Sequence, residues 1–210
     1  MEKDETIHKT ARRRSDGEAT HTSILETAMR IASIEGLASL TIGRLARELG
    51  ISKSGVFAHF RSKERLQRET LEAAERVFER EVVAPGLAAP KGLGQVEGLC
   101  EAYLSYLERG VFPGGCFFAH VVAEFDAQPG PIHDLVEAGH RGWTHLMERA
   151  IHAAQQQGEL NRGVDPAQLA FELLALLEYA NYVNMLHKDA GAIEQGRRAV
   201  RTAIDRAKPT

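Results

Sequence analysis

Residues 41–63, TIGRLARELGISKSGVFAHFRSK, constrain the fold of this chain more than any other segment. Ile42, Leu45 and Leu49 recur at the spacing of one helix face, and Thr41 stands where an N-cap residue is expected. Gly50 comes next, and glycine most easily takes the left-handed conformation that ends a helix sharply. The segment therefore predicts a short helix that closes in a tight turn.

A second short helical pattern opens at Ser52, directly after this turn. Val56 and Phe60 lie one turn apart and are expected to face inward, while Ile51 is expected to fill the corner between the helices. A tight turn and an apolar anchor in the second helix are features of a helix-turn-helix motif. By spacing alone, the segment is either such a motif or an ordinary helical hairpin with a solvated basic face.

Positive charge gathers around these two patterns. Residues 36–68 contain seven Lys or Arg and two Glu, a local charge of about +5, whereas the whole chain carries −3. A basic segment in a mildly acidic protein indicates a surface that binds a polyanion. The small residues at the start of the second helix would allow close approach, and its unpaired amides favour phosphate.

The pattern over about residues 20–68 resembles the N-terminal domain of TetR-family repressors. The residues that carry the resemblance are Ile24, Leu25, Ala28, Ile31, Gly36, Thr41, Leu45, Ala46, Gly50, Ile51, Gly55, His59, Phe60, Ser62, Lys63 and Glu64. One position departs from the family, because Phe57 stands where a tyrosine is usual. The hydroxyl that would bond a phosphate is absent there, so His59 and Lys63 are expected to provide more of the phosphate contacts.

The resemblance implies an all-α fold with a tail at residues 1–19, a helix-turn-helix domain at 20–68 and a helical ligand-binding and dimerisation domain at 69–210. It also implies a homodimeric repressor that binds a palindromic operator in double-stranded DNA and leaves it when a small-molecule effector binds. The two cysteines, Cys100 and Cys116, show no pairing pattern, so that we expect a cytoplasmic protein. The expected DNA-binding residues are Thr41, Arg44, Ser52, Lys53, Ser54, Gly55, Phe57, His59 and Lys63.

Composition agrees with a protein that has a buried core and no membrane span. Hydrophobic residues make up 43% of the chain and charged residues 26%, and no run of about 18 or more apolar residues occurs. The first residues lack the apolar core of a secretory signal and are expected to form a disordered tail. Arg12, Arg13 and Arg14 in that tail are either a solvated charge run or an arm for the minor groove.

The rest of the chain predicts further helices, over residues 62–82, 96–107, 116–125, 132–157, 165–187 and 190–207. Residues 84–94, rich in Pro and Gly, are expected to be a linker. Asp165 is a predicted N-cap, with Gln168 as its reciprocal capping partner. The helix after Asp165 is apolar on most sides and must be covered on more than one face. Leu177 and Ile204 are therefore candidates for a dimer interface.

Cys116, His120 and Glu124 fall on one helix face, which is the order of a nucleophile, a base and an orienting group. Side chains one turn apart on a straight helix tilt the same way and rarely converge on one atom. A fourth metal ligand is also missing from the sequence pattern. We therefore expect no enzyme activity, no metal and no cofactor. The alternative function is a redox-responsive regulator that acts through Cys116.

Aromatic and polar residues on apolar helix faces are the candidate ligand-binding residues, because small-molecule sites are mostly apolar with a few polar groups. They are Tyr103, Phe117, Phe118, His120, Trp143, Met147, Tyr179, Asn181 and Tyr182. For each one the alternative is a place in the ordinary core. Asn181 and Tyr182 lie on the most apolar helix, where a buried polar group needs a partner. These residues indicate an apolar or aromatic effector.

Overall fold

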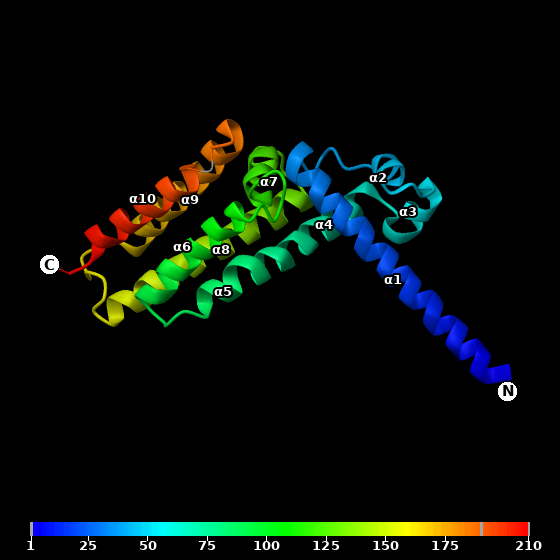
Figure 1. Cartoon of the computed structure of the whole chain (residues 1–210), viewed down its shortest axis with the longest axis horizontal. Helices are drawn as coiled ribbons and strands as arrows, with labels where there is room; N and C mark the ends of the chain where they lie inside the picture. The colour runs from blue at the N-terminus through cyan, green and yellow to red at the C-terminus, as the bar shows by residue number, and fades with distance from the viewer. Residues whose placement is uncertain (1, 190, 210) are drawn as a thin grey trace. The chain divides into compact units, whose positions relative to one another are not determined.

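The computed structural model describes residues 2–189 and 191–209, with side chains from residue 17 onward. Within those residues the secondary structure is helical and contains no strand, which confirms the all-α fold class (Figure 1). The helices are α1 (Glu2–Glu35), α2 (Ile42–Leu49), α3 (Lys53–Phe60), α4 (Lys63–Phe78), the π-helix η1 (Glu79–Val83), α5 (Ala84–Leu87), α6 (Leu93–Glu108), α7 (Phe117–Phe125), α8 (Pro131–Gln156), α9 (Pro166–His187) and α10 (Gly191–Ala207).

The chain divides into two compact units, Met1–Ala73 and Ala74–Thr210. Residues 2–19 form the start of α1, so that a helix stands where the sequence predicted a disordered tail. The side chains of Arg12, Arg13 and Arg14 lie outside the described residues, and their role stays a prediction. No helix in the described part of the chain is long and apolar enough to cross a membrane.

The first unit has a helix-turn-helix built by the local signals in the sequence. The Thr41 hydroxyl accepts a hydrogen bond from the Arg44 amide at 3.1 Å and caps α2. Gly50 ends α2 in the left-handed conformation, with φ of 66°. The Ser52 hydroxyl then caps α3 by accepting from the Gly55 amide at 3.0 Å. Two consecutive helices are thus capped and separated by one sharp turn.

Val56 and Phe60 are fully buried and anchor α3 in the core of the first unit, as predicted. Leu45 of α2 is also fully buried. The prediction that Ile51 fills the corner is wrong, because its side chain is 37% exposed. The Ile51 amide holds the corner instead, by donating to the Ala46 carbonyl at 3.0 Å.

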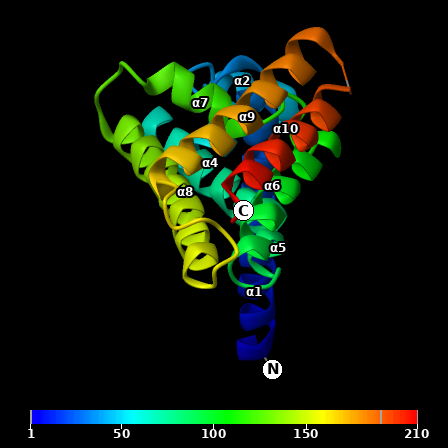
Figure 2. The same cartoon turned by 90° about the vertical axis from the view of Figure 1, so that its left-hand side faces the viewer.

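In the second unit, α9 and α10 lie side by side (Figures 1 and 2). Gly196 permits this contact, because a Cβ at that position would lie 2.8 Å from the Cβ of Ala180. Leu177 and Ile204, the expected interface residues, are 1% and 2% exposed and belong to the core of this unit. The large hydrophobic residues of α9 that remain exposed are Phe171, Tyr179, Tyr182 and Leu186.

The predicted linker at residues 84–94 is partly helical. Pro85 does not end the preceding helix, because α4 passes into the π-helix η1 and then into α5, which has a proline in its first turn. Proline is tolerated there, since the first amides of a helix have no intrahelical partner. Gly86 is buried against Leu99 of α6, where a Cβ would lie 2.6 Å from a side-chain carbon.

Asp165 caps α9 as predicted, and its carboxylate accepts from the Ala167 amide at 2.9 Å. The reciprocal role expected for Gln168 is wrong, because its side-chain amide donates to Glu172 one turn later, at 3.0 Å. Helix α7 begins at Phe117, with Cys116 as an N-cap whose side chain makes no capping hydrogen bond.

Gly196 and Gly142 form a matched pair for testing the close packing of α9 and α10. A change to Ala should give each helix a similar gain in helix propensity. At Gly142 a Cβ meets no atom within 4 Å, so Gly142→Ala is expected to raise the free energy of unfolding by about 0.5 kcal/mol. Gly196→Ala is expected to lower it by about 1–2 kcal/mol, because the two helices must move apart. Equal effects of the two changes on urea unfolding would contradict the close contact.

Candidate functional site

Helix α3 presents a solvent-exposed face that carries several of the predicted DNA-binding residues. Lys53 and Ser54 are exposed at its N-terminus, and Phe57 is 53% exposed one turn later. Gly55 is half-buried beside the capping Ser52. An exposed lysine thus lies at the N-terminus of α3, where the helix dipole also favours an anionic partner.

Other predicted DNA-binding residues already have partners within the first unit. The Arg44 guanidinium donates to the carboxylate of Glu35 at 2.7 Å, and the Lys63 ammonium donates to the Ala38 carbonyl at 2.6 Å. His59 is half-buried, with its ring 5.8 Å from that of His21. These three side chains therefore also hold the first unit together.

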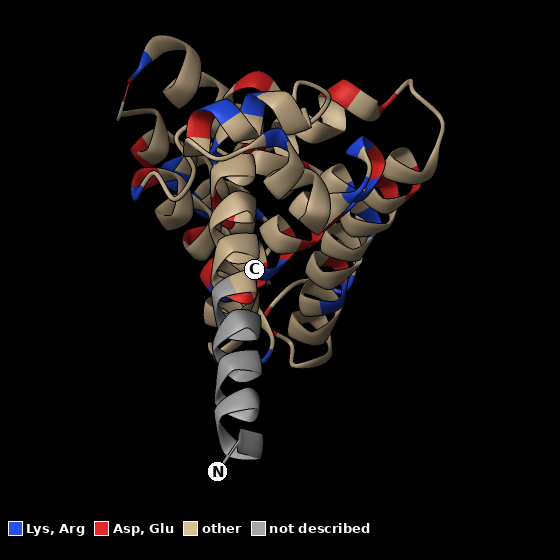
Figure 3. Cartoon of the chain, turned by 90° about the vertical axis from the view of Figure 1, so that its right-hand side faces the viewer, with Lys and Arg blue, Asp and Glu red and all other residues tan. Residues whose placement is uncertain are grey.

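The turn between α3 and α4 adds an exposed cation that the sequence analysis did not single out. Arg61 ends α3 in the left-handed conformation, with φ of 61°. Such a conformation is uncommon for a residue other than glycine. Residues 36–68 contain more Lys and Arg than acidic residues. Figure 3 shows Lys and Arg in blue and Asp and Glu in red.

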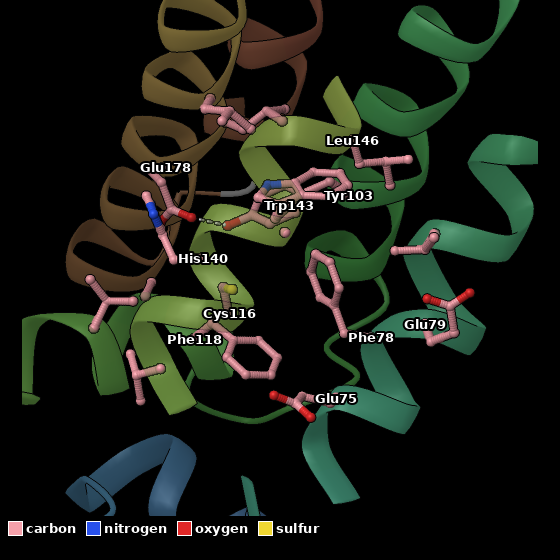
Figure 4. Close-up of a pocket in the computed structure, with 18 of the residues that line it drawn as sticks. Glu75, Phe78, Glu79, Tyr103, Cys116, Phe118, His140, Trp143, Leu146 and Glu178 are labelled. Carbon is pink, nitrogen blue, oxygen red and sulfur yellow. Dashed lines mark hydrogen bonds between the residues drawn. The ribbon is translucent and has the colours of Figure 1, made fainter. Parts of the chain in front are cut away.

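The second unit contains a cavity of about 690 Å³ between its helices (Figure 4). Its lining comes from the end of α4, from η1, from α5 to α9 and from the residues at both ends of α7. The volume lies within the range of pockets for small organic ligands, about 300–1,000 Å³. The helical unit can therefore enclose a ligand of that size.

Phe78, at the end of α4, joins four helices on one side of this cavity. Its ring packs edge-to-face against Trp143 of α8 and Phe118 of α7, with centroid distances of 5.2 and 5.6 Å. The same ring contacts Tyr103 and Tyr106 of α6, at 6.3 and 6.0 Å. These edge-to-face contacts give the cavity a wall of aromatic side chains.

Glu178 of α9 supplies a carboxyl group to the same cavity, and its Oε1 accepts a hydrogen bond from the Tyr103 hydroxyl at 2.8 Å (Figure 4). Burial raises the pKa of Glu178 above its usual value, while the bond from Tyr103 partly offsets that effect. Burial, together with the nearby Cys116 and Glu178, raises the pKa of Tyr103 well above the usual value. The Tyr103 hydroxyl therefore acts as a donor to Glu178.

The predicted ligand-binding residues divide between the cavity and its surroundings. Those that line the cavity are Tyr103, Phe118, Trp143 and Tyr182. Those outside its lining are Phe117, His120, Met147, Tyr179 and Asn181. Phe117 and Met147 are fully buried, and Tyr179 is 69% exposed.

Asn181 lies outside the cavity lining and bonds the backbone of Cys116, a residue that lines it. Its Oδ1 accepts from the Cys116 backbone amide at 3.0 Å and so bonds the amide that precedes α7. This contact explains why a buried polar residue lies on an apolar helix. His120 of α7 differs, because its Nδ1 is buried and has no hydrogen-bond partner among the described residues.

The surroundings of Cys116 do not favour the redox alternative. Cys116 lines the cavity, but its side chain is 1% exposed, and burial raises the pKa of its thiol to about 12. Reactive cysteines have a lowered pKa, because the thiolate is the nucleophile. The described residues also contain no group of three or more His, Cys, Asp or Glu that could hold a metal ion.

Two prominent residues of the cavity, Phe78 and Glu178, were not among the sequence candidates. Phe78 lies in the helix predicted over residues 62–82, where an apolar side chain is ordinarily taken as core, and a glutamate on a helix is ordinarily taken as exposed. A signal for Glu178 was present, because it is the one charged residue between Leu173 and Asn184 in a run that is otherwise mostly apolar. A lone carboxylate in such a run is either exposed or paired.

Comparisons with known protein families match both units. The family described as "Bacterial regulatory proteins, tetR family" matches residues 24–70, and "Tetracyclin repressor-like, C-terminal domain" matches residues 92–200. Together these matches cover the helix-turn-helix and most of the helices around the cavity. A search of curated proteins found no significant match.

Solved structures of TetR regulators share the fold over nearly the whole chain. A regulator from Chloroflexus aurantiacus J-10-FL is 26% identical, with a TM-score of 0.81 over 91% of this chain and 96% of its own. A putative regulator from Saccharomonospora viridis, solved in complex with choline, is 25% identical, with a TM-score of 0.75 over 90% and 96%.

AibR, solved with isovaleryl coenzyme A and operator DNA, is 22% identical, with a TM-score of 0.64 over 78% of this chain and 84% of its own. At that identity the likeness concerns the fold. The two family matches agree with the structure, which has a capped helix-turn-helix in the first unit and a helical second unit. The chain therefore belongs to the TetR family and is a non-enzymatic, DNA-binding transcriptional regulator.

Proposed function

We propose that this regulator is a ligand-responsive repressor, a homodimer that binds a palindromic operator in the cytoplasm and leaves it when a small molecule occupies the cavity of the second unit. The observation that carries the proposal is the cavity itself, which has the size of a ligand site and an aromatic wall. TetR-family proteins bind operator DNA and small effectors, and AibR has been solved with both kinds of partner.

In this proposal α3 is the recognition helix and enters the major groove. Lys53, Ser54 and Phe57 support that role because they are exposed on one short helix. Lys53 is the candidate for a base edge, and the exposed Phe57 can contact a thymine methyl or a sugar. Lys63 and His59 remain candidates for phosphate contacts, in addition to the contacts that they make within the protein.

The homodimer is proposed from the exposed face of α9. Phe171, Tyr179 and Leu186 are 69%, 69% and 79% exposed in the protomer. They follow one another at intervals of eight and seven residues, which places them on one side of the helix. A second copy of this face can cover them by two-fold symmetry, and two-fold symmetry matches a palindromic operator.

Release of DNA requires that the effector bind more tightly to the form that cannot hold the operator. Helix α4 supports a connection, because its residues belong to both units and its end supplies Glu75 and Phe78 to the cavity. Helix α7 is the second proposed element, since left-handed Gly115 precedes it and Gly130 follows it. Both elements contact the site where the effector is proposed to bind.

The DNA-binding proposal is tested by selecting duplexes from random DNA with the purified protein and measuring their affinity by fluorescence anisotropy. Lys53→Ala is expected to reduce discrimination at one base position by about 1–3 kcal/mol, because a base contact is lost. Lys91→Ala removes an exposed charge from the second unit and should leave the affinity unchanged. An equal loss on every sequence for Lys53→Ala would refute the base contact, and wild-type protein that selects no sequence would refute the function.

The dimer proposal predicts that Phe171→Glu combined with Leu186→Glu gives monomers, since two buried carboxylates would face their symmetry mates. Sedimentation velocity at micromolar concentration should show a dimer for the wild type and a monomer for the double variant. Ile34→Glu, a similar change at an exposed position of α1, serves as the control and should remain dimeric. A monomeric wild type at that concentration contradicts the proposal.

The effector proposal predicts that Trp143→Ala weakens binding of a compound found by a thermal-shift screen, by about tenfold or more, because a large aromatic contact surface is lost. The same variant should bind the operator as the wild type does when no compound is present. Isothermal titration calorimetry and operator anisotropy measure the two properties separately. Unchanged binding of the compound would place it outside the cavity.

A further inference from the structure

Negative charge dominates the rim and wall of the cavity. Its lining contains one basic residue, Arg149, and the imidazole of His140. The acidic residues of the lining are Glu75, Glu79, Asp126 and Glu178. The acidic residues come from four separate segments of the unit, α4, η1, the end of α7 and α9. A ligand that enters the cavity therefore meets carboxylates from several sides.

One carboxylate oxygen of Glu178 has no hydrogen-bond partner in the described part of the protein. Its Oε1 accepts from Tyr103, whereas Oε2 is buried and makes no hydrogen bond among the described residues. Leaving a buried carboxylate oxygen without a partner costs free energy, and more when the group is charged. A donor or a positive charge supplied from the cavity would remove that cost.

Aromatic rings lie next to this carboxyl group. Trp143, Phe118 and Tyr103 line the cavity together with Phe78, and Figure 4 shows them around the space that Glu178 borders. The face of an aromatic ring attracts a cation within about 6 Å, and Trp does so most strongly. Carboxylates and aromatic faces both favour positive charge, and neither favours an anion.

We propose that the cavity binds an organic cation, an ammonium group on an apolar or aromatic body, with the positive charge held between Glu178 and the aromatic wall. The inference rests on the proposed effector site and adds the chemical class of the effector. The aromatic side chains cover the apolar body, while the Oε2 of Glu178 pairs with the ammonium group. Burial raises the pKa of Glu178, and a cation bound beside it would act in the opposite direction by stabilising the ionised carboxylate.

The experiment compares two probes of the same shape that differ in charge, meta-hydroxyphenyltrimethylammonium and meta-tert-butylphenol. Isothermal titration calorimetry on the full-length wild type is expected to show at least tenfold tighter binding of the cation. Glu178→Gln is expected to abolish that preference while the neutral probe binds as before, since the amide oxygen can still accept from Tyr103. Glu97→Gln removes an exposed carboxylate of α6 outside the cavity lining and should keep the preference.

Each other outcome overturns the inference in a distinct way. Equal binding of the two probes, or tighter binding of the neutral one, refutes a cationic ligand and leaves an effector cavity for neutral molecules. A preference that survives Glu178→Gln refutes the role of Glu178. Absence of binding by either probe also refutes the inference. Selection of an operator by the protein without any probe tests the regulator function separately, so that the two failures can be told apart.

Discussion

The edge-to-face contacts of Phe78 are the interaction on which the second unit depends. One ring at the end of α4 touches Tyr103 and Tyr106 of α6, Phe118 of α7 and Trp143 of α8. The cavity lies beside this ring, and Tyr103, Phe118 and Trp143 line it together with Phe78. The same contacts connect the wall of that cavity to α4, whose first turns belong to the helix-turn-helix unit.

The helix-turn-helix could be predicted from the sequence because its signals act over a few residues. Thr41 and Ser52 each cap the helix that follows them, and Gly50 takes the left-handed turn that its position requires. The error at Ile51 shows the limit of such patterns, because an apolar residue next to a turn can be exposed while its amide makes the important contact. The π-helix η1 was likewise not predicted, since Pro85 suggested an end to the helix.

The cavity could be predicted only in part, because its residues come together from helices far apart in the sequence. Aromatic residues on apolar faces pointed to Tyr103, Phe118 and Trp143, but the candidates also included Met147, which is fully buried outside the lining. Leu177 and Phe171 are both apolar residues of α9, yet one is buried within the protomer and the other is exposed. Periodicity cannot distinguish these two faces, because both satisfy the same helical spacing.

The central claim is that occupancy of the cavity and binding of the operator oppose each other. It is tested most directly by measuring the affinity of one cavity-binding compound for the free protein and for the protein saturated with its selected operator. The account predicts weaker binding in the presence of operator, and thermodynamic linkage requires that the compound weaken operator binding by the same factor. An identical affinity in the two states would show that the two sites are not coupled and would contradict the account.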